Sequence, residues 1–236
     1  MDLKEEEILG DQIRTHWYYR AKAAAVVREL RDIRPTEILD IGAGSGYFSR
    51  VLLEKTSAAR ATCVDIGYSQ DGDGICNGKP IAFRRAIEKS GADLVLAMDV
   101  MEHVPNETTL MLPYIRSVAP GTRFIISVPA FDFLWSSHDV FLEHYRRYTL
   151  KSLEDTVRRC GLAIDRSHYY FGAVFPIAAA LRLLDRGASQ GEPKSQLRRH
   201  GMLTNGVLSA LCALERPVMD YNRLFGLTVF AVCHKP

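Results

Sequence analysis

Three glycines stand at alternate positions, Gly42, Gly44 and Gly46, directly after an apolar run that ends near Asp40. Each glycine costs extra conformational entropy to order, so three at one turn indicate that something approaches the backbone closely. A strand, a glycine turn and a helix together place backbone N–H groups and a helix N-terminus beside a nucleotide. The chemistry that this stretch predicts is the binding of a nucleotide-like molecule.

The spacing of the glycines narrows the choice of ligand. A dinucleotide fingerprint has the pattern G-x-G-x-x-G, whereas this chain has G-x-G-x-G followed by Tyr47. The carboxylate of Asp40, two residues before the first glycine, would repel a pyrophosphate and suits a ligand with a positive ammonium group. S-adenosylmethionine (SAM) has such a group on its methionine half and a nucleoside on its other half.

Two further acids fall at the ends of predicted strands. Asp65 is about 20 residues past the turn, where an acid hydrogen-bonds ribose hydroxyls, and Asp99 ends a continuous apolar run. Ligands of open parallel sheets bind at the carboxyl ends of the strands. We therefore expect Asp40, Asp65 and Asp99 to surround one cleft.

The elements that must position these residues alternate along the chain, which favours an α/β fold with a parallel sheet and helices on both faces. Strands are predicted at 37–42, 60–66, 81–86, 92–100, 122–129, 163–171 and 227–235. Helices are predicted at 3–31, 46–55, 107–118 and 149–162, with a kink or break at Pro113. We expect an N-terminal helical lid at 1–34, a core at 35–171 and 227–236, and a helical insertion at 172–226, with a flexible polar centre at 186–201, that forms a substrate cap.

Composition sets limits on partners and compartment. The chain has 236 residues with a formal net charge of +2, which is too balanced to favour a nucleic-acid partner. The five cysteines form no C-x-x-C pair and the N-terminus is acidic, so we expect a reducing, cytoplasmic setting without a zinc site or disulfides. The apolar runs at 169–184 and 206–214 are shorter than a membrane-spanning helix, and a peripheral membrane contact stays open.

Several motifs in order resemble a known family. "ILDIGAGSGYFS", the acid-ended second strand and "DLVLAMDVMEHV" are together similar to the class I SAM-dependent methyltransferases. "HWYYRAKAAAV", "SVPAFDFLWSSHDVFLEHYRRYT", "YYFGAVFPIAAALRLL" and "GLTVFAVCHKP" resemble a bacterial small-molecule subgroup. The resemblance implies a Rossmann-like, seven-stranded sheet in the order 3-2-1-4-5-7-6 with strand 7 antiparallel. It also implies an enzyme that moves a methyl group from SAM to a small-molecule acceptor, with anionic, glycan-linked and lipid-linked acceptors all open.

The same resemblance implies the cofactor contacts. The glycines would approach the methionine half, Asp65 the ribose, and Ile66 the adenine. No aspartate follows the third strand, so adenine is expected to meet Ala86 and Ile87 through backbone and packing. The full set of expected cofactor residues is Tyr18, Arg20, Asp40, Gly42, Ala43, Gly44, Gly46, Asp65, Ile66, Ala86, Ile87, Asp99, Val100 and His103.

The segment after the fifth strand supplies candidates for the acceptor side. Methyl transfer needs a base only if the acceptor must lose a proton, and His138 and His144 have a suitable ordinary pKa. Tyr145 and Arg146 are predicted to contact the acceptor. The alternative is that Arg146 and Arg147 pair with acids of the N-terminal helix and that the tyrosines only pack.

Two further alternatives stay open. Asp99, Glu102 and His103 form D-x-x-E-H, which could ligate a metal, but the sequence favours a bracing role for Glu102, a place beside the cofactor for His103, and no metal. Tyr18 and Arg20 could reach the cofactor's carboxylate or belong to a packed helix face.

Two other functions compete with methyl transfer. One is a nucleotide-dependent oxidoreductase on a similar sheet, which the glycine spacing and Asp40 disfavour. The other is a non-catalytic SAM-fold partner protein. The sequence leaves the acceptor atom and the oligomeric state undetermined.

Overall fold

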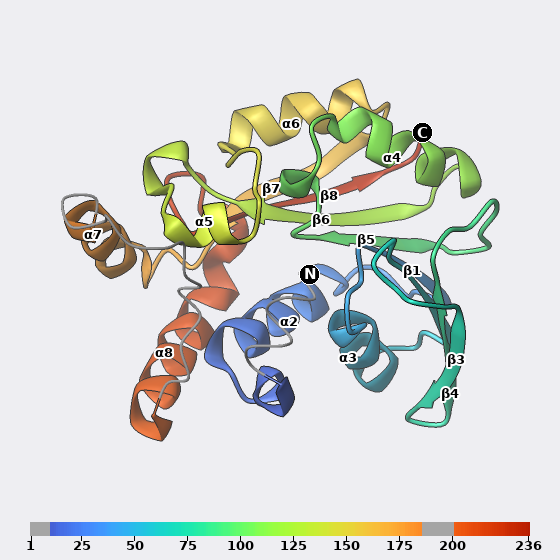
Figure 1. The fold of residues 1–236 in the computed structure, drawn as a ribbon, viewed down its shortest axis with the longest axis horizontal. Helices are drawn as coiled ribbons and strands as arrows, with labels where there is room; N and C mark the ends of the chain where they lie inside the picture. The colour runs from blue at the N-terminus through green and yellow to red at the C-terminus, as the bar shows by residue number, and fades with distance from the viewer. Residues whose placement is uncertain (1–9, 186–200) are drawn as a thin grey trace.

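The computed structural model describes residues 10–185 and 201–236, and an eight-stranded mixed sheet runs through this part of the chain (Figure 1). The strands are β1 Glu37–Ile41, β2 Arg60–Val64, β3 Gly72–Cys76, β4 Lys79–Arg84, β5 Leu94–Met98, β6 Arg123–Pro129, β7 Ala163–Tyr170 and β8 Thr228–His234. Their order across the sheet is β3-β4-β2-β1-β5-β6-β8-β7. The strands from β4 to β6 in this order are parallel, whereas β3 and β8 run antiparallel to their neighbours.

The expected count of seven strands is wrong, because β3 adds an eighth at the edge of the sheet. β3 and β4 form a hairpin through Asn77 and Gly78, whose φ angles are 52° and 73°. An Asn-Gly pair suits a two-residue hairpin loop, since that loop requires positive φ at both positions. Without β3, the other seven strands follow the expected order, with β8 as the antiparallel strand.

Helices α2 (Trp17–Glu29) and α3 (Tyr47–Lys55) cover one face of the sheet (Figure 1). The helix expected at 3–31 is shorter than predicted, because His16 is extended and a 3-10 turn, η1 (Gly10–Arg14), precedes it; residues 1–9 lie outside the described part. Buried small residues such as Ala23 and Ala25 allow α2 to pack closely. Ile38 of β1 points into this layer.

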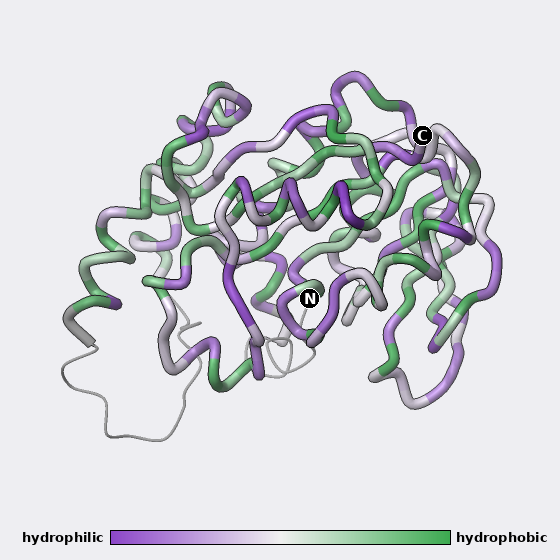
Figure 2. The backbone as a smooth tube through the Cα atoms, turned by 90° about the horizontal axis from the view of Figure 1, so that it is seen from above, coloured by the Kyte–Doolittle hydropathy of each residue, from purple (hydrophilic) through white to green (hydrophobic). Residues whose placement is uncertain are grey.

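Helices α4 (Glu107–Ser117) and α6 (Leu150–Arg159) cover the opposite face, where Leu39 of β1 points. Side chains alternate between the two faces along each strand, so both cores draw on the same strands. Of the kink or break expected at Pro113, the break is wrong, because α4 continues through this residue. Seen from above in Figure 2, hydrophilic and hydrophobic stretches alternate along this layer, as expected for helices with one solvated side.

Short elements after β5 and β6 carry the residues expected to do chemistry. They are η2 (Met101–His103), η3 (Asp132–Leu134) and α5 (Ser137–Phe141). Ser136 begins α5 through a capping box with Asp139, whose carboxylate accepts the Ser136 N–H at 2.9 Å. This box turns Asp139 into the fold, where it is fully buried.

The insertion expected at 172–226 is helical where it is described, with α7 (Phe175–Asp185), α8 (Met202–Glu215) and the 3-10 turn η4 (Arg216–Tyr221). The polar centre expected at 186–201 lies, except for Gly201, outside the described residues. The Trp17 N–H donates to Asn205 Oδ1 at 2.7 Å, so α8 lies beside α2 (Figure 1). Apolar side chains of α7 and α8 are exposed, including Leu181 of α7 at 59% and Leu203 of α8 at 83%. Within 10–185 and 201–236, every helix is too short or too polar to cross a membrane.

Candidate functional site

The carboxyl ends of three neighbouring parallel strands carry Asp40, Asp65 and Asp99. β2, β1 and β5 pair in that order. Asp40 is the last residue but one of β1, and Asp65 and Asp99 directly follow β2 and β5. Because these strands share one direction, the three acids reach the same edge of the sheet. The cleft that the sequence expects among them stays a prediction.

The glycine turn between β1 and α3 has a left-handed backbone at each glycine, with φ of 62°, 53° and 71° at Gly42, Gly44 and Gly46. A β-carbon at Gly42 would lie 2.3 Å from Val100 Cγ2, and one at Gly46 would lie 3.0 Å from Cys63 Sγ. At these two positions the protein's own side chains fill the space that the sequence assigns to a ligand. The backbone of Gly42 therefore lies close to the Val100 side chain. Ala43 is buried between the glycines.

Asp65 is bonded to the same turn. Its Oδ2 accepts the Gly44 N–H at 3.0 Å and its Oδ1 accepts the Gly67 N–H at 2.9 Å. The Tyr68 hydroxyl donates to the Gly44 carbonyl at 2.6 Å. A carboxylate has about four lone-pair sites, so Asp65 can still accept hydrogen bonds from a diol.

The residues expected around adenine differ in exposure. Ile66 is 84% exposed next to Asp65, which is unusual for an apolar side chain of this size. Ala86 is also exposed, and Ile87 is half-buried against the core on the α4 side of the sheet. An open apolar surface therefore adjoins Asp65.

Asp40 lies inside the fold and not at its surface. Its side chain is buried, and its Oδ2 accepts the Ser49 hydroxyl of α3 at 2.8 Å. Burial raises the pKa of Asp40 to about 6. Asp40 therefore links β1 to the helix that follows the glycine turn.

Lys22 of α2 is a site residue that sequence reasoning missed. It is fully buried, and its Nζ donates to Asp99 Oδ2 and, at 3.1 Å, to the Tyr18 hydroxyl. The Ser127 hydroxyl donates to the other Asp99 oxygen at 3.2 Å. Burial alone would lower the pKa of Lys22 and raise that of Asp99, but their mutual attraction reverses both directions. The available signal was a lysine inside an alanine-rich helical run, "RAKAAAVV".

Helix α2 treats its two predicted cofactor residues differently. The Tyr18 ring stacks on Phe171 with centroids 5.0 Å apart, and its hydroxyl reaches the Lys22–Asp99 pair. Arg20 is exposed. The helix therefore brings Tyr18, but not Arg20, into contact with the pair at the end of β5.

The structure brings Glu102, His103 and His144 together. One ligand-type atom of each lies within 4.8 Å of the other two, and the two imidazole centroids are 4.6 Å apart. The exposed Tyr145 donates its N–H to the Glu102 carbonyl at 2.7 Å, which joins the two chain segments.

Glu102 is the least satisfied buried group of this cluster. Its side chain is fully buried, and neither carboxylate oxygen accepts a hydrogen bond from another described residue. Burial and the nearby negative charge of Asp99 raise the pKa of Glu102 well above its usual value.

Asp139 orients His144. The Nδ1 of His144 lies 3.0 Å from Asp139 Oδ1, and Arg147 donates to both Asp139 oxygens at 2.7 and 3.0 Å. Burial opposes ionisation, but the hydrogen bond from His144 and the charge of Arg147 hold the pKa of Asp139 well below its usual range. His138 is not part of this cluster, and burial lowers its pKa to about 4.

The arginines after α5 pair with acids, but not with those of the N-terminal helix. Arg147 pairs with Asp139, and Arg146 pairs with Glu107 at 2.8 Å and donates to the Pro105 carbonyl at 2.6 Å. That part of the sequence-based alternative is wrong, because α4 and α5 supply nearer carboxylates. The predicted acceptor role of Arg146 competes with these bonds.

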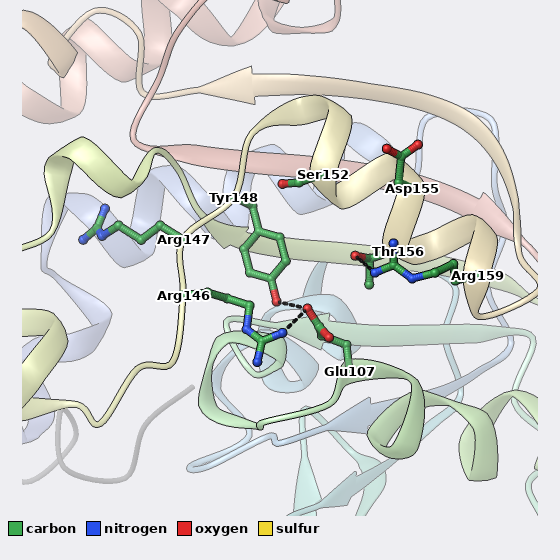
Figure 3. A pocket seen from close by; sticks show the side chains of 8 residues that line it. All are labelled: Glu107, Arg146, Arg147, Tyr148, Ser152, Asp155, Thr156 and Arg159. Carbon is green, nitrogen blue, oxygen red and sulfur yellow. Dashed lines mark hydrogen bonds and ion pairs between the residues drawn. The ribbon is translucent and has the colours of Figure 1, made fainter.

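A cavity of about 270 Å³ lies beside the Arg146–Glu107 pair. In Figure 3, Arg146 and Tyr148 converge on Glu107, whereas Arg147 points away from them. Its lining residues are Glu107, Arg146, Arg147, Tyr148, Ser152, Asp155, Thr156 and Arg159. Neither the glycine turn nor Asp65 or Asp99 lines this cavity, so it lies apart from the strand ends that carry the two acids.

Aromatic residues at the ends of β6 and β7 have unusual backbones. Phe131 and Phe171 have φ of 58° and 66°, which bulky side chains seldom adopt. Phe131 stacks on Tyr169 with centroids 5.0 Å apart, and Phe171 contacts Tyr18. Residues with such strained backbones cluster at functional sites. The sequence pattern did not predict the positive φ angles of these two residues.

Comparisons with known proteins identify the family and the fold of this chain. A family model described as a methyltransferase domain matches residues 15–167. No curated protein matches the chain.

Three solved structures illustrate the fold. A putative methyltransferase of Haloferax volcanii, in complex with the Trm112 methyltransferase activator, is 15% identical over 95% of this chain and 92% of that chain, with a TM-score of 0.57. A putative sarcosine dimethylglycine methyltransferase from Galdieria sulphuraria is 14% identical over 93% and 84%, with a TM-score of 0.51. Phosphoethanolamine N-methyltransferase 2 of Haemonchus contortus, in complex with SAM, is 17% identical over 98% and 56%, with a TM-score of 0.56. At these identities the likeness shows the fold alone.

Proposed function

We propose that this chain, which belongs to the methyltransferase domain family, transfers the methyl group of SAM to a small-molecule acceptor at the carboxyl ends of β5 and β6. Membership follows from the family model over residues 15–167, and the family and its fold make SAM the cofactor. One observation carries the placement of the site. The glycine turn, Asp65 and the Lys22–Asp99 pair meet at the ends of three neighbouring strands.

The residues around the glycine turn fit this cofactor. Asp65 has acceptor capacity for ribose hydroxyls, and the exposed Ile66 beside it offers an apolar surface to a purine. Asp40 supports the glycine turn from inside through Ser49. Val100, Ala86, Ile87 and His103 belong to the same proposed contact set.

When bound, SAM supplies a methyl group that its own sulfonium charge activates. The chain then has to align the acceptor and exclude water. Lys22 and Ser127 fix the Asp99 carboxylate from two sides. The Tyr18 ring, which stacks on Phe171, lies beside the Lys22 ammonium, with 5.2 Å between its centroid and Lys22 Nζ.

The acceptor side offers two predicted bases. His144 is oriented by Asp139, which leaves Nε2 as its proton acceptor. His138 is neutral near pH 7, because burial lowers its pKa to about 4. Either histidine serves only an acceptor that must lose a proton.

We propose an acceptor with an apolar part, such as a lipid-linked or glycan-linked molecule. The aromatic residues Phe131 and Phe175 meet with centroids 5.7 Å apart, and α7 and α8 carry further exposed apolar side chains. The name of the phosphoethanolamine N-methyltransferase described above indicates an acceptor with an anionic phosphate group. If the acceptor of this chain also has an anionic group, we would assign Tyr145 and Arg146 to bind it.

A different reaction on the same fold is the main rival. A neighbour with 14% identity and a TM-score of 0.55 is the [4+2]-cyclase SpnF. The glycine spacing disfavours an oxidoreductase.

Incubation of the purified protein with methyl-labelled SAM and fractionated metabolites tests the proposal. Label in an acceptor fraction is the expected result, and tight SAM binding without transfer to any fraction would favour the rival. Asp65→Ala should weaken SAM binding by about 1.5–3 kcal/mol. Asp73→Ala, on the exposed edge strand β3, is the matched control and should bind SAM as the wild type does.

A further inference from the structure

We propose that Glu102, His103 and His144 bind a divalent transition-metal ion at the carboxyl end of β5, and that this ion holds an oxygen atom of the acceptor. The sequence places Asp99, Glu102 and His103 close together but not His144, and the sequence-based expectation there is a site without metal. The binding of the ion is independent of methyl transfer, whereas its task toward the acceptor rests on the proposed function.

The unsatisfied Glu102 carboxylate points to a ligand. A buried polar group without hydrogen bonds costs about 1–3 kcal/mol, and more if it is charged. Buried charges in proteins are therefore paired or coordinate metals. Glu102 has two buried oxygens and no hydrogen-bond donor from another described residue. An ion between Glu102 and the two imidazoles would supply the missing partner.

The distances within the cluster also suit a bound ion. Metal–nitrogen and metal–oxygen bonds of about 2.0–2.2 Å allow two ligand atoms on one ion to lie up to about 4.4 Å apart. The three candidate atoms already lie within 4.8 Å of one another. Side-chain rotations that move each atom by less than about 1 Å would complete the site.

The hydrogen bonding of His144 also suits a metal ligand. Histidine ligands commonly donate their other N–H to a carboxylate, which fixes the ring and its tautomer. Asp139 occupies this place against Nδ1 of His144, so Nε2 remains as the ligand nitrogen. Arg147 and Ser136 hold Asp139 in turn. The joint between Tyr145 N–H and the Glu102 carbonyl keeps the two ligand-bearing segments together.

The ligand set indicates the class of ion. Two imidazoles and one carboxylate suit Zn²⁺, Co²⁺ or Mn²⁺, whereas Ca²⁺ prefers oxygen ligands alone. Three protein ligands leave coordination positions open, as in catalytic metal sites. η2 follows Asp99 after a single residue, Val100, so these positions lie at the edge of the sheet where the acceptor is proposed. A hydroxyl bound there would lose its proton more readily, and His144, as a ligand, would leave His138 as the nearby predicted base.

Calorimetric titration of the metal-stripped full chain with Zn²⁺ and Mn²⁺ tests the site. We expect one ion per chain, binding weakened about 100-fold or more in Glu102→Gln and His144→Gln, and Ca²⁺ heats near baseline. This loss exceeds the 10–100-fold typical of outer-shell partners. His138→Gln, a nearby histidine outside the cluster, is the matched control and should bind the ion within about twofold of the wild type.

Two variants on separate segments keep the test decisive, since circular dichroism will identify one that does not fold. No ion binding by the wild type, or an equal loss in His138→Gln, would overturn the site. Ion binding with the expected variant pattern but no methyl transfer would leave the site standing and count against the proposed function.

Discussion

Two clusters of glutamate and histidine differ in whether the buried glutamate has hydrogen-bond partners. This difference bears on whether a cluster is structural or functional. Glu29 of α2 accepts a hydrogen bond from His168 Nε2 at 2.9 Å and from Arg166 Nε at 2.5 Å. Glu102 accepts none from another described residue. Each cluster has ligand-type atoms close enough together to hold an ion.

The pKa directions of the two glutamates differ in the same way. Burial opposes the charge of both, but hydrogen bonding and the charges of His168 and Arg166 lower the pKa of Glu29, whereas the Asp99 charge adds to burial and raises the pKa of Glu102. The Glu29 cluster satisfies itself and ties α2 to β7. The comparison teaches that proximity of ligand-type atoms does not make a site, and that a buried carboxyl without a hydrogen-bond partner distinguishes one.

The largest expected effect is on the satisfied cluster. Glu29→Gln removes the buried charge that pairs with Arg166 and His168, and breaking a buried pair costs about 3–5 kcal/mol of folding free energy. Urea unfolding measures this loss. Asp73→Asn, at an exposed pair, should cost below about 1 kcal/mol, and a similarly small loss for Glu29→Gln would show that the cluster is not structural.

Asp40 is an intermediate case, with one hydrogen bond from Ser49. Because burial raises its pKa to about 6 in the folded chain, folding retains a proton that the unfolded chain releases near pH 4. The stability contributed by protonated Asp40 is present below pH 4 and is lost as the pH rises through 6. The expected loss is about 3 kcal/mol.

Urea unfolding of the wild type and Asp40→Asn at pH 4 and pH 7 isolates this contribution, since other groups titrate alike in both. The wild type should lose more stability between these two pH values than the variant. Equal losses would mean that Asp40 has an ordinary pKa.

A gain in stability is expected at the unsatisfied cluster. Glu102→Met replaces an unpaired buried carboxyl by an apolar side chain of similar length, which should raise the metal-free unfolding free energy by about 1–3 kcal/mol. Urea unfolding in the presence of a chelator measures the change. Destabilisation by a comparable amount would reveal that Glu102 has a partner and would erase the contrast with Glu29.

The smallest effect is expected at Asp220, the third member of the Glu29 cluster by distance. Asp220 pairs with Arg28 at 3.2 Å and Arg31 at 3.1 Å near the surface. Asp220→Asn should therefore cost at most about 1 kcal/mol, as read from the midpoint of urea unfolding. A loss as large as that of Glu29→Gln would place Asp220 inside the buried network.

Local sequence patterns predicted the elements that carry the candidate site. The strands, the glycine turn and the acids at strand ends follow from hydrophobic runs and from residues adjacent in the chain, so Asp65 and Asp99 could be placed without coordinates. β3 was missed although its Asn-Gly turn was a readable signal, because the run before it has little apolar character.

Partners distant in sequence were not predictable. Nothing near Lys22 indicates that it pairs with Asp99, and nothing near Glu102 indicates that His144 returns to it through α5. The arginine partners were wrong for the same reason, since Asp139 faces Arg147 only after the capping box at Ser136 forms. The unmet carboxylate of Glu102 is a property of packing, and only coordinates reveal it.

The most direct test of the contrast is anomalous diffraction from crystals of the full chain soaked with Mn²⁺ or Zn²⁺. The account predicts an anomalous peak among Glu102, His103 and His144 and none among Glu29, His168 and Asp220. A peak at the Glu29 cluster alone, or no peak at either cluster, would contradict it.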